Sequence, residues 1–252
     1  MAARRGIFLA PFGELCDPRR VAALAARAEE RGWDGFFVWD HLHYAAPVRE
    51  IADPWITLSA VAAATERLRL GPMVTPPARR RVQKLTREAV TLDHLSGGRL
   101  VLGLGLGSDR YGELSRYGDE TDGKRRAGLL DDALERLTAY WGGELQPPPL
   151  QRPRIPIWLA ARWPNRRPLH RAIRWDGLFP VNLAGPDAIA ELVGEIRVAR
   201  SPDAGPFDVV VSNPPQTDPA PWEAAGATWC LTGFGPEPTE DRVRAAIDAG
   251  GA

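Results

Sequence analysis

The chain has 252 residues with 32 basic and 32 acidic side chains, and this balance gives no reason to expect a nucleic acid as the partner. Two cysteines, Cys16 and Cys230, are too few for a disulfide framework or a metal-ligand set of their own. No apolar run approaches the roughly 18 residues of a membrane span, and the apolar stretch after Arg5 is too short for a signal peptide, so we expect a cytoplasmic protein without membrane contact.

Strand and helix patterns alternate along the whole chain. Short apolar runs predict eight strands, at residues 6–11, 33–39, 68–75, 100–106, 155–160, 177–181, 207–211 and 228–232. Capped or amphipathic segments predict helices at residues 18–31, 53–65, 79–95, 123–141, 168–175, 186–200, 221–225 and 239–249. Eight strand-helix units in one chain are most economically closed into a single (β/α)8 barrel, here spanning residues 1–252.

The fourth predicted strand ends in the glycine-rich sequence Gly103-Leu-Gly-Leu-Gly107. Continuous apolar strands are typical of a parallel sheet that is covered by helices on its outer face. Glycines at the end of such a strand permit positive φ and remove the side chains that would hold a planar ligand away from the backbone. Gly105, Leu106 and Gly107 are therefore candidates to border a flat cofactor.

Chemistry in a (β/α)8 barrel is expected at the carboxyl ends of the strands. The second strand ends in Trp39, Asp40 and His41, which supply the titratable groups of this edge. The fifth ends in the segment 160–165, where an arginine precedes a predicted helix N-terminus, an arrangement that suits a phosphate group. Together these features predict a site for a large planar cofactor that carries phosphate.

The chain also resembles the luciferase-like flavin or deazaflavin oxidoreductases over nearly its whole length. The motifs that carry the resemblance are Val38-Trp-Asp-His-Leu42, Arg67-Leu-Arg-Leu-Gly71, Val74-Thr-Pro76, Arg87-Glu-Ala-Val-Thr-Leu-Asp93, Leu95-Ser-Gly-Gly-Arg99, Asp131-Asp-Ala-Leu134, Trp141-Gly-Gly143, Ile157-Trp-Leu-Ala160, Trp163-Pro-Asn165 and Arg174-Trp-Asp-Gly177. The resemblance implies a (β/α)8 barrel that holds FMN or coenzyme F420 at its C-terminal face, a small organic substrate, and a homodimer.

The resemblance also implies roles for individual residues. His41 would lie at the reactive face of the cofactor ring and exchange a proton, with Asp40 as the neighbouring acid that sets its tautomer. The residues expected to contact the cofactor are Trp39, Val74, Thr75, Gly105, Leu106, Gly107, Ala160, Ala161, Arg162 and Asn165. A non-proline cis peptide is expected at the bulge around Val74 and Thr75.

One departure from the family pattern bears on the substrate. Deazaflavin sugar dehydrogenases of this family carry a glutamate just after the strand-four glycines, where this chain has Ser108 and Asp109, and the nearest glutamate is Glu113. The sequence therefore argues against sugar dehydrogenation. The run Arg79-Arg-Arg81 is interpreted as the solvated start of a helix.

Several functions remain open at this level. FMN would support oxygenation of a substrate, whereas F420 would support hydride transfer to or from it. Alternatives are a barrel that binds a flavin without catalysis and, from the spacing of His41 and His43, a metal-dependent hydrolase, which would need further ligands at other strand ends.

Overall fold

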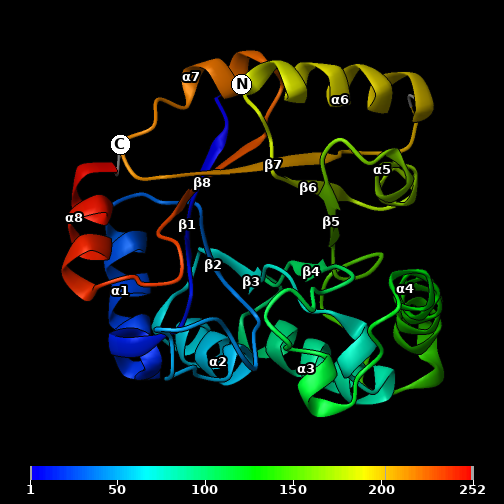
Figure 1. The fold of residues 1–252 in the computed structure, drawn as a ribbon, viewed down its shortest axis with the longest axis horizontal. Coiled ribbons are helices and arrows are strands. Elements are labelled where there is room, and N and C mark those ends of the chain that lie inside the picture. The colour runs from blue at the N-terminus through cyan, green and yellow to red at the C-terminus, as the bar shows by residue number, and fades with distance from the viewer. Residues whose placement is uncertain (1, 202, 251–252) are drawn as a thin grey trace.

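The computed structural model describes residues 2–201 and 203–250. Figure 1 shows a ring of helices around a central set of strands, which confirms the predicted (β/α)8 barrel. The strands are β1 (Arg4–Leu9), β2 (Gly35–Val38), β3 (Arg69–Pro72), β4 (Leu102–Leu104), β5 (Ile157–Arg162), β6 (Gly177–Val181), β7 (Asp208–Asn213) and β8 (Trp229–Gly233). The α-helices are α1 (Pro18–Glu30), α2 (Pro54–Ala64), α3 (Val82–Leu95), α4 (Gly123–Ala139), α5 (Arg166–Ala172), α6 (Pro186–Ala199), α7 (Ala220–Ala224) and α8 (Glu240–Gly250).

The strands are all parallel and follow the order β3-β2-β1-β8-β7-β6-β5-β4. The ring is closed between β3 and β4 by two isolated bridges, from Leu70 to Leu100 and from Thr75 to Leu104. Between the two bridges lies the cis peptide Met73–Val74, which is the non-proline cis bond expected in this bulge.

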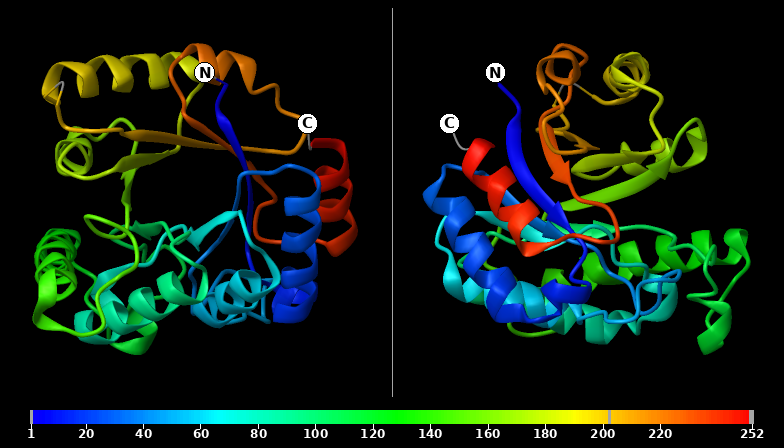
Figure 2. Two further views of the ribbon diagram at one scale, coloured as in Figure 1. Left: turned by 180° about the vertical axis from the view of Figure 1, so that it is seen from behind. Right: turned by 60° about the vertical axis from the view of Figure 1, so that its left-hand side comes forward.

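Two hydrophobic clusters hold the barrel together. The larger cluster lies between the strands and the surrounding helices, and alternate strand residues such as Ile7 and Phe36 contribute to it. The smaller cluster fills the inside of the barrel with large side chains, among them Phe37, Trp158 and Trp229. Successive side chains of a strand point to opposite faces, so the barrel strands contribute residues to both clusters. The views in Figure 2 show the helices on the outside of the barrel of strands.

Helix starts agree with the capping signals of the sequence. Asp17 accepts a hydrogen bond from the backbone of Arg19 at the start of α1, and Asp53 accepts two at the start of α2. A proline follows each of these aspartates, where its missing N–H costs nothing. No helix in the described part of the chain has the length and apolar character needed to cross a membrane.

Several predicted boundaries are wrong; β3, for example, ends at Pro72 and not at residue 75. The helix expected from residue 79 begins at Val82, after a short 3-10 turn η2 (Pro77–Arg79), because Arg79 and Arg80 turn toward Asp40. The segment between β4 and α4 contains a short 3-10 turn, η3 (Ser115–Tyr117). The helix α5 begins two residues earlier than expected, since Asn165 caps it.

Candidate active site

Asp40 and His41 follow β2 directly, yet their side chains have different surroundings. The carboxylate of Asp40 is fully buried, accepts a hydrogen bond from Thr75 Oγ1 at 2.5 Å, and pairs with Arg79 and Arg80. Trp55 Nε1 lies 3.3 Å from the same carboxylate. Asp40 is therefore a buried anchor for the segments around it and does not take the role of the acid that orients His41.

His41 finds its acid in another loop. Its Nδ1 lies 2.9 Å from Oε2 of Glu113, and the backbone N–H of Leu42 donates to Oε1 of the same carboxylate at 2.7 Å. Burial alone would raise the pKa of Glu113, but the contacts with His41, Arg79 and Leu42 outweigh it and lower that pKa below its ordinary value. Glu113 is therefore ionised at neutral pH and requires a proton on Nδ1, which leaves Nε2 of His41 free for chemistry.

Arg79 joins the two buried carboxylates. Its guanidinium donates to Oε1 of Glu113 at 2.5 Å and, with the other nitrogen, to the backbone oxygen of Asp40 at 2.6 Å and to the Asp40 carboxylate. The side chain is only 2% exposed. The interpretation of Arg79-Arg-Arg81 as a solvated helix start is thus wrong for Arg79 and for the half-buried Arg80, whereas Arg81 is exposed.

The carboxylate from this loop also changes the conclusion about sugar substrates. That conclusion depended on the absence of a glutamate directly after the glycines of β4. The loop between β4 and α4 folds back so that Glu113, several residues later, reaches His41. A carboxylate therefore stands beside the histidine after all, and the argument against sugar dehydrogenation does not hold.

Aromatic rings surround His41. The ring centroids of Phe12, Trp39 and Tyr44 lie 6.1, 5.7 and 5.2 Å from the His41 ring, and Tyr111 lies 4.8 Å from Tyr44. Burial and then the neighbouring Tyr111 raise the pKa of Tyr44 above its ordinary value. The rings of Phe12, Trp39 and Tyr44 form an aromatic wall beside His41. Apolar surroundings of this kind lower the local dielectric and strengthen the electrostatic interaction between His41 and Glu113.

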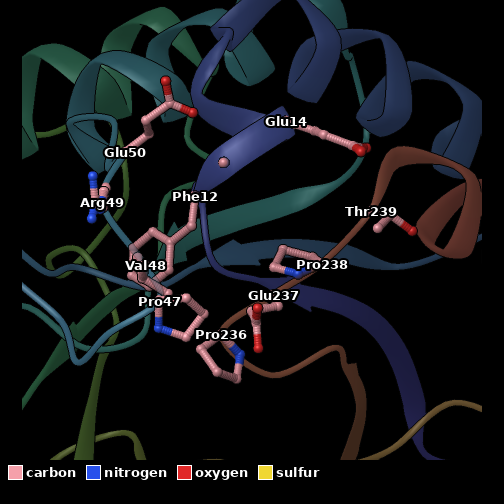
Figure 3. A pocket seen from close by; sticks show the side chains of 11 residues that line it. Phe12, Glu14, Pro47, Val48, Arg49, Glu50, Pro236, Glu237, Pro238 and Thr239 are labelled. Atoms are coloured by element: carbon pink, nitrogen blue, oxygen red, sulfur yellow. The ribbon is translucent and has the colours of Figure 1, made fainter.

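A pocket of about 430 Å³ opens beside this wall, between the loops that follow β1, β2 and β8 (Figure 3). Phe12 forms part of both the pocket and the wall. The side chains of Pro47, Val48, Pro236 and Pro238 gather around Phe12 in the pocket. The space next to the candidate site is thus lined largely by apolar groups.

Some of the predicted cofactor contacts come together at the mouth of the barrel. Trp39, Val74 and Ala160 are partly buried and pack on the inner barrel cluster. A Cβ added to Gly105 would lie 2.7 Å from Val74 and 3.2 Å from Ala160, so the segments that follow β3 and β4 are neighbours of β5. Gly105 is therefore required for close packing of the surrounding side chains.

The other predicted contacts are placed differently. Thr75 is buried against Asp40, and Leu106 and Ala161 pack in the outer cluster, so these two side chains face away from the inside of the barrel. Gly107 adopts a φ of +70°, a conformation that favours glycine. Arg162 and Asn165 are exposed at the end of β5, where Asn165 caps α5.

Residues that sequence reasoning missed are Glu113, Arg79, Arg80, Tyr44 and Tyr111. They lie on loops, and Glu113 is 72 positions away from the histidine it contacts, so no motif spacing indicates the pair. The one feature of the sequence that points to Glu113 is that it is the nearest glutamate after the glycines of β4. In the described part of the chain, no cluster of three or more potential ligands accompanies His41 and His43 to form a metal site.

Comparisons with known proteins show the family and the fold of this chain. The family model described as luciferase-like monooxygenase matches residues 6–244. An uncharacterized protein of Mycobacterium tuberculosis is 29% identical over 263 residues, covering 90% of this chain and 91% of its own. An F420-dependent secondary alcohol dehydrogenase, solved with an F420-acetone adduct, superimposes with a TM-score of 0.79 at 17% identity over 98% of this chain and 97% of that one.

A third similar structure is the FMN-bound oxygenating constituent of 3,6-diketocamphane monooxygenase from Pseudomonas putida. It has a TM-score of 0.66 and 18% identity, covering 85% of this chain and 67% of the other. The same barrel therefore holds F420 in one similar protein and FMN in another. Because the family model covers almost the entire chain, this protein belongs to the luciferase-like monooxygenase family.

Proposed function

We propose that this protein is an oxidoreductase that uses F420 to transfer a hydride to or from a small organic substrate, with His41 exchanging the accompanying proton. The observation that carries the proposal is the His41–Glu113 pair. Conversion between an alcohol and a carbonyl compound moves a proton together with the hydride, so it needs a positioned acid-base group. Similarity to an F420-dependent alcohol dehydrogenase supports this choice.

The residues at the barrel mouth suit a flat ring system. Val74, Ala160 and Gly105 form a floor of small groups above the filled barrel interior. Trp39 Nε1 is buried and, among the described residues, has no hydrogen-bond partner, so it offers a donor to a bound group. We assign the ring to this floor and the phosphate-bearing tail to the segment 160–165, where Arg162 is exposed at the end of β5.

When bound, F420 would supply or accept the hydride. The side chains of the protein hold and transfer the accompanying proton. The ionised Glu113 keeps the Nδ1 proton of His41 in place, so that Nε2 accepts a proton from a substrate hydroxyl or, once protonated, returns it to a carbonyl oxygen. The aromatic rings of Phe12, Trp39 and Tyr44, 5.2–6.1 Å from the imidazole, supply apolar surface beside it.

The decisive experiment is a parallel titration of the purified protein with F420 and FMN, each oxidised and reduced, followed by absorbance and intrinsic fluorescence. We expect tight uptake of F420 and oxidation of small alcohols. The His41→Ala variant should bind F420 like the wild type but lose turnover, whereas the matched control His43→Ala should retain it. Wild-type turnover by His41→Ala would contradict the proposed role of this residue.

FMN-dependent oxygenation is the second candidate, favoured by the description of the family and by the FMN-bound structural neighbour. Preferential uptake of reduced FMN with oxygen consumption would support it over F420 chemistry. Cofactor uptake without turnover would instead indicate a ligand-binding barrel. We further propose that the protein is a cytoplasmic homodimer, which sedimentation analysis and cell fractionation would test.

A further inference from the structure

We infer that Arg79 is a positioning residue, which fixes the protonation pattern of His41 by holding Glu113 against the buried Asp40. The inference concerns the site of the proposed proton transfer, and its significance for catalysis rests on that proposed function. The effect of Arg79 on the tautomer of His41 is a property of the protein alone, so it can be tested without a cofactor.

The geometry places Arg79 between three segments of the chain. It belongs to the turn η2, its partner Asp40 follows β2, and its partner Glu113 lies in the loop between β4 and α4. The side chains of Arg79, Asp40 and Glu113 are 2%, 0% and 4% exposed. Water therefore cannot replace these contacts, and loss of one partner leaves the others unsatisfied in a low-dielectric environment.

Each Glu113 oxygen has a separate function. Oε1 accepts from Arg79 and from the backbone of Leu42, and Oε2 remains for Nδ1 of His41. His41, Arg79 and Leu42 together lower the pKa of Glu113 against the effect of burial, so loss of the guanidinium would shift that pKa upward. A protonated Glu113 can donate to Nδ1, which would move the imidazole proton to Nε2 and abolish the acceptor that the proposed reaction needs.

The charges around His41 do not offer a substitute. Arg80 is committed to Asp40 at 3.1 Å and to Glu88 at 3.4 Å. Tyr44, beside the His41 ring, and its neighbour Tyr111 are phenols without positive charge, and Arg110 lies over the Tyr111 ring, 5.2 Å from its centroid. A lysine at position 79 would keep the charge, but its single ammonium lacks the planar fork that spans two carboxylates.

The test uses cofactor-free protein labelled with ¹⁵N-histidine and long-range ¹H–¹⁵N spectra, which distinguish the two neutral tautomers. The chain has four histidines, so single substitutions of the other three assign His41. We expect the wild type to show the Nδ1–H tautomer alone and Arg79→Met to show a substantial fraction of the Nε2–H form. Arg81→Met removes the exposed neighbouring arginine and should leave the spectrum unchanged.

Should Arg79→Met fail to fold, Arg79→Lys provides the second measurement and should show a smaller shift in the same direction. A pure Nδ1–H tautomer in a folded Arg79 variant would overturn the inference. In the cofactor-loaded enzyme, we expect a loss in kcat on the order of 10²-fold with little change in KM. Failure to bind F420 or FMN would refute the proposed function, while the tautomer result would still decide the role of Arg79.

Discussion

Glu113 provides the strongest test of how the site is stabilised. Its carboxylate is 4% exposed and accepts hydrogen bonds from His41, Leu42 and Arg79. Glu113→Leu removes all three interactions and leaves the buried guanidinium with Asp40 as its remaining carboxylate. Breaking a buried charge pair by removing one partner costs about 3–5 kcal/mol. In a domain of this size the loss corresponds to a decrease in Tm of roughly 10 °C.

Glu113→Gln separates charge from packing. The amide oxygen can still accept one hydrogen bond, so we expect a smaller loss, about 2 kcal/mol at pH 7, because a hydrogen bond to a charged group is replaced by a neutral one. The native contacts lower the pKa of Glu113 below its ordinary value of 4.5. Its contribution to folding is therefore complete above the unfolded-state pKa and is lost as the pH falls through the folded-state pKa.

Urea unfolding followed by circular dichroism at a series of pH values measures both effects. The difference in unfolding free energy between wild type and Glu113→Gln should be constant near neutral pH and shrink as the pH falls below about 4.5, the unfolded-state value. The exposed Glu135 on α4 provides a matched control, and Glu135→Gln should change stability by less than about 0.5 kcal/mol. An equal loss in both variants, or a difference independent of pH, would refute the reasoning.

Three further predictions concern the barrel itself. Arg99 donates to four backbone carbonyls, and Arg99→Met should lower the unfolding free energy by about 3 kcal/mol in urea melts; a loss below about 1 kcal/mol would contradict this. In Gly71→Ala the added Cβ would lie 1.9 Å from the backbone oxygen of Val101, where β3 and β4 close the barrel, and this variant should not be expressed in soluble form. The control Gly128→Ala, at an exposed position of α4, should be neutral or stabilise the protein by about 0.5 kcal/mol. Burial raises the pKa of Cys230 to about 11, so its thiol should react with a disulfide reagent at pH 8 far more slowly than that of an unfolded control; equal rates would show that it is accessible.

The positions of helices and strands were largely predictable because their signals are local. The aspartate-proline pairs at Asp17 and Asp53 begin helices as expected, since a cap needs only its own backbone neighbours. The boundary at Arg79 was not predictable in this way. Three successive arginines suggest a solvated helix start, and only burial of two distant carboxylates makes the chain turn inward there.

In the candidate site, too, some features follow from local sequence and others only from contacts between distant residues. The sequence alone determined the strand-helix alternation, the placement of His41 at a strand end and the glycines that follow β4, since each depends on neighbours along the chain. Only the tertiary structure decided that Glu113, and not the adjacent Asp40, contacts the imidazole, and that Arg79 bridges both carboxylates. Buried charges require partners, and closure of the barrel brings together the loops after different strands that supply them.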